Sequence, residues 1–116
     1  MNEKAVLIEE NEDGRITTIK LNRPEKKNAM NYDILVGLQN AIDKIERSKT
    51  RVVIITGGDD FFSAGIDLKF LTGQEKDSEG VIPDLRVPHN FRYFTNTWIQ
   101  PIFTKIEKME KPVIAK

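Results

Sequence analysis

The chain has 116 residues, of which 39% are hydrophobic and 31% are charged, a composition typical of one soluble domain. Its 18 basic and 18 acidic side chains balance, which removes the electrostatic argument for a nucleic acid or an anionic membrane as partner. Cysteine is absent, which excludes disulfides, cysteine-ligated zinc and thiol nucleophiles.

The start of the sequence does not have the pattern of a signal peptide. The start, "MNEKAVLIEENE", lacks the apolar core of a signal peptide, and no run approaches the ~20 apolar residues of a membrane span. We therefore expect a cytoplasmic protein. The sequence stops at "EKPVIAK", where a short apolar strand begins, so we also expect further polypeptide to follow.

The first half of the chain has the pattern of an α/β fold. Residues 5–8 and 15–21 are typical strands, and the turn signal "NEDG" between them predicts a hairpin. Asn31 is a favourable N-cap, and the apolar residues after it follow helical spacing. The members of this apolar stripe are Ile34, Leu35, Leu38, Ala41, Ile42 and Ile45.

The run "RVVIIT", residues 51–56, does not alternate, which predicts a strand that is buried on both faces. A strand, a helix and a buried strand in succession indicate a parallel crossover. Residues 67–71 are expected to begin a short helix.

The second half contains one polar segment and one long helical pattern. Residues 72–88 are rich in Gly, Asp, Glu, Ser and Pro, and we expect a flexible loop there. Residues 90–110 have helical spacing, with Pro101 expected to kink or split the helix near residues 98–100. "KPVIA" is a further strand of the buried type. The apolar stripe of the long helix consists of Phe91, Phe94, Trp98, Ile102, Ile106 and Met109.

The loop "FFSAGID" after the buried strand is the strongest candidate for a site. In open α/β folds, ligands lie beyond the carboxyl ends of the parallel strands. Small residues there let a ligand approach the backbone, and amides near Ile66 that precede a helix can donate to an anion. On spacing alone, a plain strand-to-helix turn capped by Asp67 remains the favoured interpretation.

Other phosphate and metal sites are disfavoured. The longer segment "GGDDFFSAGID" lacks the GK[ST] ending and the G-x-G-x-x-G pattern, and Asp59 and Asp60 would repel a phosphate. Asp59, Asp60 and Asp67 lack the spacing of a hard-cation loop, so we expect a solvated acidic turn and no metal.

Histidine, tryptophan and lysine side chains are further candidates for chemistry. His89, the only histidine, has no recognisable catalytic partner, and a loop histidine without a role is the favoured interpretation. Trp98 is expected to belong to the core rather than to a stacking platform. Lys26 and Lys27 are either solvated or phosphate contacts, and the residues leave both open.

Three segments carry a family resemblance when they are taken in order: "ITTIKLNRPEKKNAMN", "RVVIITGGDDFFSAGIDLKFL" and "EKPVIAK". With a helix before the second and another before the third, the chain resembles the N-terminal portion of the crotonase (enoyl-CoA hydratase/isomerase) superfamily. The resemblance implies a crotonase-like ββα spiral in which residues 1–116 form part of a single domain. It also implies acyl-CoA thioester substrates, coenzyme A only as part of the substrate, and homotrimers or hexamers.

The resemblance also implies roles for individual residues. The backbone N–H of Ile66 falls at the first oxyanion-hole donor, and Lys69 could meet a phosphate of coenzyme A. Ile at position 66 is bulkier than the Ala of many hydratases and is similar to the dienoyl-CoA isomerase branch. The remaining implied contacts to the thioester and to coenzyme A are Lys26, Lys27, Asn28, Ala29, Ser63, Ala64, Gly65, Asp67 and Leu68.

Part of the implied active site is missing from this sequence. In the family, the second oxyanion donor comes from a Gly-rich segment after the strand matching "KPVIA", and the acids and bases lie beyond it. We therefore expect the 116-residue chain alone to be inactive. A truncated acyl-CoA-binding or subunit-interaction module, and a plain doubly wound domain with another ligand, remain alternatives. Hydration and isomerisation are not distinguished.

Overall fold

The structure, a computed structural model, describes residues 4–74, 76–77, 80–81 and 83–116. Its main sheet has the order β1-β2-β3-β6, formed by β1 (Val6–Glu10), β2 (Ile16–Leu21), β3 (Val52–Thr56) and β6 (Val113–Ala115). Strands β1 and β2 form an antiparallel hairpin, whereas β3 runs parallel to both β2 and β6. The predicted hairpin and the predicted parallel crossover are both confirmed.

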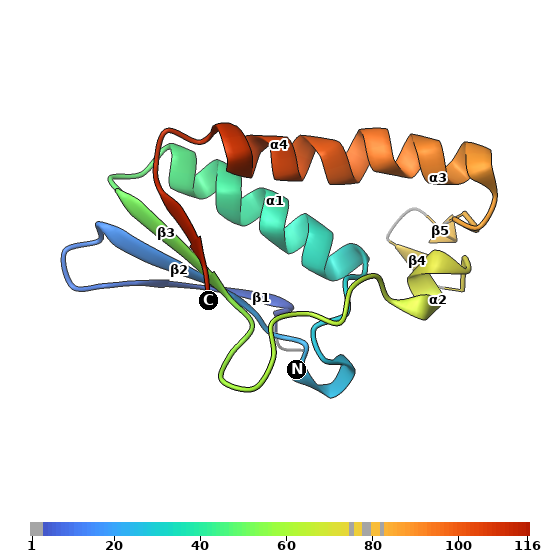
Figure 1. The fold of residues 1–116 in the computed structure, drawn as a ribbon, viewed down its shortest axis with the longest axis horizontal. Helices are drawn as coiled ribbons and strands as arrows, with labels where there is room; N and C mark the ends of the chain where they lie inside the picture. Colours follow the sequence, from blue (N-terminus) through green and yellow to red (C-terminus); the bar gives the residue numbers. More distant parts are fainter. Residues whose placement is uncertain (1–3, 75, 78–79, 82) are drawn as a thin grey trace.

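Helix α1 (Tyr32–Glu46) makes the crossover from β2 to β3. Asn31 caps it as predicted, because its side-chain oxygen accepts a hydrogen bond from the amide of Ile34 at 3.1 Å. All six apolar residues of the predicted stripe are buried. The helix packs on the sheet and lies beside α4 (Gln100–Lys108), so both helices cover the same face (Figure 1).

The prediction that residues 51–56 are buried on both faces is wrong. Ile19 and Val53, on the helix-covered face, are 0% and 1% exposed. On the opposite face Ile16 is 39% and Ile114 52% exposed, so β6 is not a fully buried strand either. The second face is exposed because α1 and α4 both lie on one side of the sheet in the described part of the chain (Figure 1).

The second long helix is continuous and consists of α3 (Pro88–Phe94), the π-helical turn η2 (Thr95–Ile99) and α4 (Figure 1). In η2 the amide of Gln100 bonds to the carbonyl of Thr95, five residues back. This wider turn ends next to Pro101, which has no N–H to donate, so the helix continues without splitting. Phe91 does not belong to the buried stripe, since it is 45% exposed. Within the described residues, no helix is long and apolar enough to cross a membrane.

The predicted short helix is present as α2 (Leu68–Leu71). Beyond it, β4 (Lys76–Asp77) and β5 (Gly80–Val81) pair as a small antiparallel ribbon. Leu85 anchors the chain after this ribbon, because it is 3% exposed and its amide donates to the carbonyl of Leu71 at 2.8 Å. Residues 75, 78–79 and 82 of the expected flexible loop lie outside the described residues, and its flexibility stays a prediction.

The packing of α1 predicts a large effect of truncating Ile42, which is 1% exposed. Ile42→Ala should lower the free energy of unfolding by about 2–5 kcal/mol, because it removes buried methyl groups and leaves a cavity. Glu46→Ala, at an exposed position in the last turn of the same helix, is the matched control and should change this free energy by less than about 0.5 kcal/mol. Urea unfolding of both variants measures the difference. Equal midpoints would contradict the packing described here.

Candidate functional site

Two loops that are far apart in sequence meet beyond the ends of β2 and β3 (Figure 1). Met30 and Ile66 form an isolated parallel bridge between them. In this bridge the Met30 amide donates to the carbonyl of Gly65 at 2.6 Å, and the Asp67 amide donates to the carbonyl of Met30 at 2.9 Å. One turn away, the Ala64 amide donates to the carbonyl of Lys27 at 2.9 Å. The residues implied by the family resemblance are thus brought together.

The side chain of Asn28 holds the two loops in place. It is 0% exposed, and its backbone is left-handed, with φ of 56°. Its Oδ1 accepts from the amide of Arg23 at 2.7 Å, and its Nδ2 donates to the carbonyls of Gly57 and Phe62 at 2.9 and 3.0 Å. The hydroxyl of Ser63 donates to its carbonyl at 2.8 Å. Both donors and the acceptor of this buried amide are therefore satisfied.

Two glycines give the loop its shape. A Cβ at Gly57 would collide with the carbonyl oxygens of Phe61 and Phe62, so the chain can double back only without a side chain there. Gly65 has φ of +97°, a conformation that side-chain-bearing residues rarely adopt. A Cβ built on Gly65 would meet nothing within 4 Å, so the backbone beside Ile66 faces open space. A ligand can therefore approach the main chain here.

Asp67 joins the loop to α2 and to the opposite loop. Its Oδ1 accepts from the amide of Phe70 at 3.1 Å, and its Oδ2 accepts from Nη1 of Arg23 at 2.8 Å. The same Nη1 donates to the carbonyl of Ala29 at 2.9 Å. Burial alone would raise the pKa of Asp67, but the hydrogen bonds from Arg23 and Phe70 outweigh it and lower the pKa. The carboxylate is a structural anchor, as its predicted capping role requires.

The amide of Ile66 differs from its neighbours. Among the hydrogen bonds formed by the described residues, none uses the N–H of Ile66. Its side chain is 38% exposed, and it directly precedes the residue that caps α2. An amide fixed on both sides and left unpaired can stabilise negative charge on a ligand atom without rearrangement.

The remaining predicted contacts lie around this amide or on the loop surface. Leu68 is 74% exposed, and Ala64 is also exposed. Lys26, Lys27 and Lys69 are exposed cations. The carbonyl of Lys27 is bonded to the loop, whereas its side chain is exposed. The ammonium group of Lys27 could therefore contact an anionic ligand group without disturbing the site.

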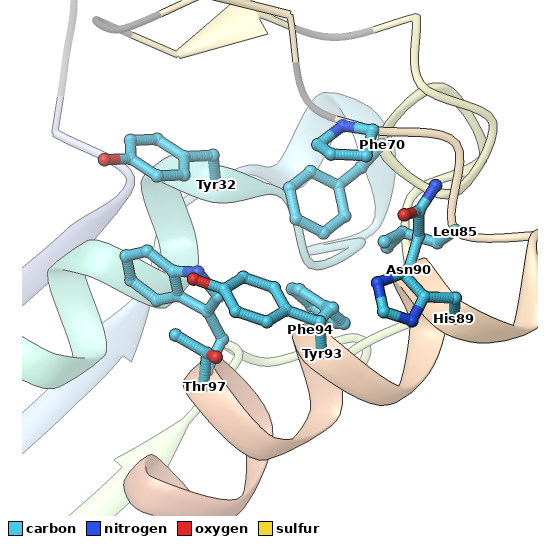
Figure 2. Close-up of a pocket in the computed structure, with 10 residues that line it drawn as sticks. Tyr32, Phe70, Leu85, His89, Asn90, Tyr93, Phe94 and Thr97 are labelled. Carbon is cyan, nitrogen blue, oxygen red and sulfur yellow. The ribbon is translucent and has the colours of Figure 1, made fainter.

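The prediction for Trp98 is confirmed, whereas the prediction that His89 lies in a loop is wrong. His89 is in the first turn of α3 and not in a loop. Trp98 packs against the core, as predicted, but also edge-on against Tyr32 with ring centroids 5.4 Å apart. Both line a cavity of about 560 Å³ whose walls include Tyr32, Phe70, Tyr93 and Phe94; Figure 2 shows the cavity. Phe70, which forms part of the wall, belongs to α2, the helix that follows the Ile66 loop in the chain.

Reasoning from the sequence missed the roles of Arg23 and Asn28 as ties between the loops. A usable signal existed for Asn28: asparagine is enriched in left-handed backbone, and it follows a polar turn that contains proline. No local signal marks Arg23, since its partner Asp67 is 44 residues away in the chain.

The bonds of Asn28 predict a large loss on its removal. Asn28→Ala should lower the free energy of unfolding by about 3 kcal/mol, because it deletes three hydrogen bonds and forces Ala into left-handed backbone. Asn28→Gly is the matched control, since Gly lacks the bonds but tolerates the backbone, and it should recover about 1 kcal/mol. Urea unfolding of both variants separates the loss of the hydrogen bonds from the cost of the left-handed backbone. A loss under 1 kcal/mol for both variants would refute the role of Asn28.

The lowered pKa of Asp67 predicts a pH dependence of stability. Because the folded state holds this proton less tightly than the unfolded state, the contribution is complete above about pH 5. It begins to fall near the ordinary pKa of 3.8 and is lost as the pH falls through the lowered pKa of the folded state. Asp67→Asn keeps a capping oxygen but does not titrate. Its stability should therefore be lower at neutral pH and change less between about pH 5 and 3 than that of the wild type. Parallel pH profiles from urea unfolding would contradict this account.

Comparison with known proteins agrees with the geometry. The family model described as enoyl-CoA hydratase/isomerase matches residues 11–116. The mitochondrial Delta(3,5)-Delta(2,4)-dienoyl-CoA isomerase of Mus musculus is 37% identical over 98 residues, which are 84% of this chain and 29% of that protein. The chain therefore spans about a third of this relative's length.

Solved structures give the same result. An enoyl-CoA hydratase from Thermoplasma volcanium matches with a TM-score of 0.75 and 35% identity, over 97% of this chain and 40% of that one. An enoyl-CoA hydratase from Bacillus anthracis matches with a TM-score of 0.70 and 29% identity, over 96% and 38%. The family match over residues 11–116, together with these relatives, shows that the chain belongs to the enoyl-CoA hydratase/isomerase family and has the crotonase fold.

Proposed function

We propose that this chain binds acyl-CoA thioesters and that the N–H of Ile66 donates to the thioester oxygen. The observation that carries the proposal is the unpaired amide of Ile66, held between Gly65 and Asp67, which both bond to Met30. Membership of the enoyl-CoA hydratase/isomerase family supports the substrate class. The thioester would be the substrate, with coenzyme A as part of it and no separate cofactor.

The chemistry suits a fixed donor. When a proton leaves the carbon beside a thioester, negative charge gathers on the thioester oxygen as an enolate forms. A preorganised N–H at that position stabilises the charge as it develops, and loss of one such donor costs about 3 kcal/mol. A backbone donor does not depend on the side chain at position 66, so Ile can stand there.

The surrounding loops would hold the rest of the ligand. The exposed side chains of Lys26, Lys27 and Lys69 lie on the segments that flank the loop and would contact phosphates of coenzyme A. The backbone of residues 63–65 would lie against the thioester, since Gly65 faces open space. Assembly as a homotrimer or hexamer and a cytoplasmic location are part of this proposal and are equally open to test.

A second candidate function is binding without turnover. No described residue that lines the cavity carries a carboxylate, the usual general acid or base of a hydratase or isomerase. A chain of 116 residues acting alone would then be an acyl-CoA-binding or subunit-interaction module. Turnover of crotonyl-CoA by the purified chain would exclude this alternative.

Substitution of Ile66 tests the proposed donor. Ile66→Pro removes the N–H but leaves both bonds of the bridge to Met30, which use the carbonyl of Gly65 and the amide of Asp67. Acetoacetyl-CoA, which enolises readily, should bind the proline variant about 10-fold to 100-fold more weakly than the wild type. Isothermal titration calorimetry measures both affinities.

Free coenzyme A supplies the internal control, since it has no thioester oxygen and should bind both proteins equally. Ile66→Ala is the matched variant, because it keeps the N–H and should remain within about 3-fold of the wild type. Equal affinity of wild type and Ile66→Pro for acetoacetyl-CoA would overturn the assignment.

A further inference from the structure

One wall of the cavity is formed by two neighbouring ridges of one helix. Side chains four residues apart lie on the same face of a helix, so 90, 94 and 98 form one ridge and 89, 93 and 97 the next. On the inner ridge Phe94 is 5% exposed and Trp98 packs against the core. On the outer ridge Tyr93 is 66% exposed, and His89 and Thr97 are exposed too.

The walls of the cavity are aromatic on both sides. Tyr32 meets Trp98 edge-on at 5.4 Å between ring centroids, and Phe70 meets Phe94 edge-on at 5.1 Å. Figure 2 shows Tyr32 and Phe70 on one side of the space and Phe94, with Tyr93, on the other. Such rings are rigid, because each has two rotatable side-chain bonds, and they favour another ring in offset or edge contact.

The outer ridge adds polar groups to this apolar space. Within the described part of the chain, the imidazole of His89 and the hydroxyls of Tyr93 and Thr97 make no hydrogen bond to protein. All three line the cavity, and His89 lies beside Asn90 in Figure 2. Because these groups are exposed, water can bond to them in the empty cavity. A ligand that carries oxygen could take the place of that water, whereas a saturated hydrocarbon chain could not.

We propose that this cavity binds a planar aryl group that carries an oxygen substituent, as the acyl part of a thioester. The inference rests on the proposed function, since the thioester would lie at Ile66 and its acyl group would extend past Phe70 into the cavity. The aromatic walls contact the ring, and the ridge of His89, Tyr93 and Thr97 contacts the substituent.

The size of the space fits this ligand class. A cavity of about 150 Å³ already holds benzene, and this one has about 560 Å³, so a substituted ring and its linking carbons fit together. The linking carbons lead back to α2, whose residue Phe70 forms one wall and whose cap, Asp67, follows Ile66 directly.

The test compares three thioesters that have the same number of acyl carbons, and acetyl-CoA serves as the short control. The full chain, labelled with nitrogen-15, is titrated with nonanoyl-CoA, 3-phenylpropanoyl-CoA, 3-(4-hydroxyphenyl)propanoyl-CoA and acetyl-CoA. Trp98 is the only tryptophan, so its single indole N–H signal reports occupancy of the cavity. The phenyl thioester should bind about 3-fold more tightly than nonanoyl-CoA, and the hydroxyl should add about 3-fold more. Acetyl-CoA should leave the indole signal unmoved.

Two variants isolate the polar ridge. Tyr93→Phe removes one hydroxyl and keeps the ring, so it should weaken binding of the hydroxyphenyl thioester about 3-fold and leave the phenyl thioester unchanged. Thr104→Val, at an exposed position of α4 that does not line the cavity, is the control and should change neither.

The outcomes separate this inference from the proposed function. Binding of acetyl-CoA without any preference for aryl over nonanoyl thioesters overturns the aryl site and leaves the proposed function standing. Failure of every thioester to bind, acetyl-CoA included, overturns both. An indole signal that does not move with either aryl thioester also overturns the site.

Discussion

The site depends on one buried side-chain amide, that of Asn28. It bonds to the start of its own turn at Arg23 and to the carbonyls of Gly57 and Phe62 in the opposite loop. Each of these backbone groups, if left unpaired in the interior, would cost about 1–3 kcal/mol. These bonds hold the two loops in the arrangement in which Met30 and Ile66 form their bridge.

The unpaired amide of Ile66 is a consequence of this framework. Its two neighbours are fixed by the same partner, Met30, so the N–H has a defined direction. The ion pair of Arg23 with Asp67 acts from the other side and holds the cap of α2. Rigid donors of this kind are what charge stabilisation in an active site requires, because no reorganisation is needed when charge develops. Under the proposed function, acyl-CoA thioesters are the substrates on which this geometry would act.

The sequence allowed much of the fold to be predicted but only part of the site. The hairpin, the cap at Asn31 and the stripe of α1 follow from local patterns and are confirmed. The burial of β3 was predicted wrongly, because it depends on whether both faces of the sheet are covered, which a run of aliphatic residues cannot specify. Arg23 and Asn28 act across long sequence separations, so no local rule identifies their partners. The ridge that His89 shares with Tyr93 exists because α3 begins at Pro88, whereas the predicted helix began at residue 90.

The central claim is that the N–H of Ile66 meets the thioester oxygen, and its proton resonance tests this most directly. In a nitrogen-15-labelled chain, the Ile66 amide proton should move downfield when acetoacetyl-CoA binds, because it gains a charge-assisted hydrogen bond. Free coenzyme A should leave this signal nearly in place while it shifts signals of residues around Lys26 and Lys27. If acetoacetyl-CoA binds at saturation and the Ile66 amide signal stays in place, the account is wrong.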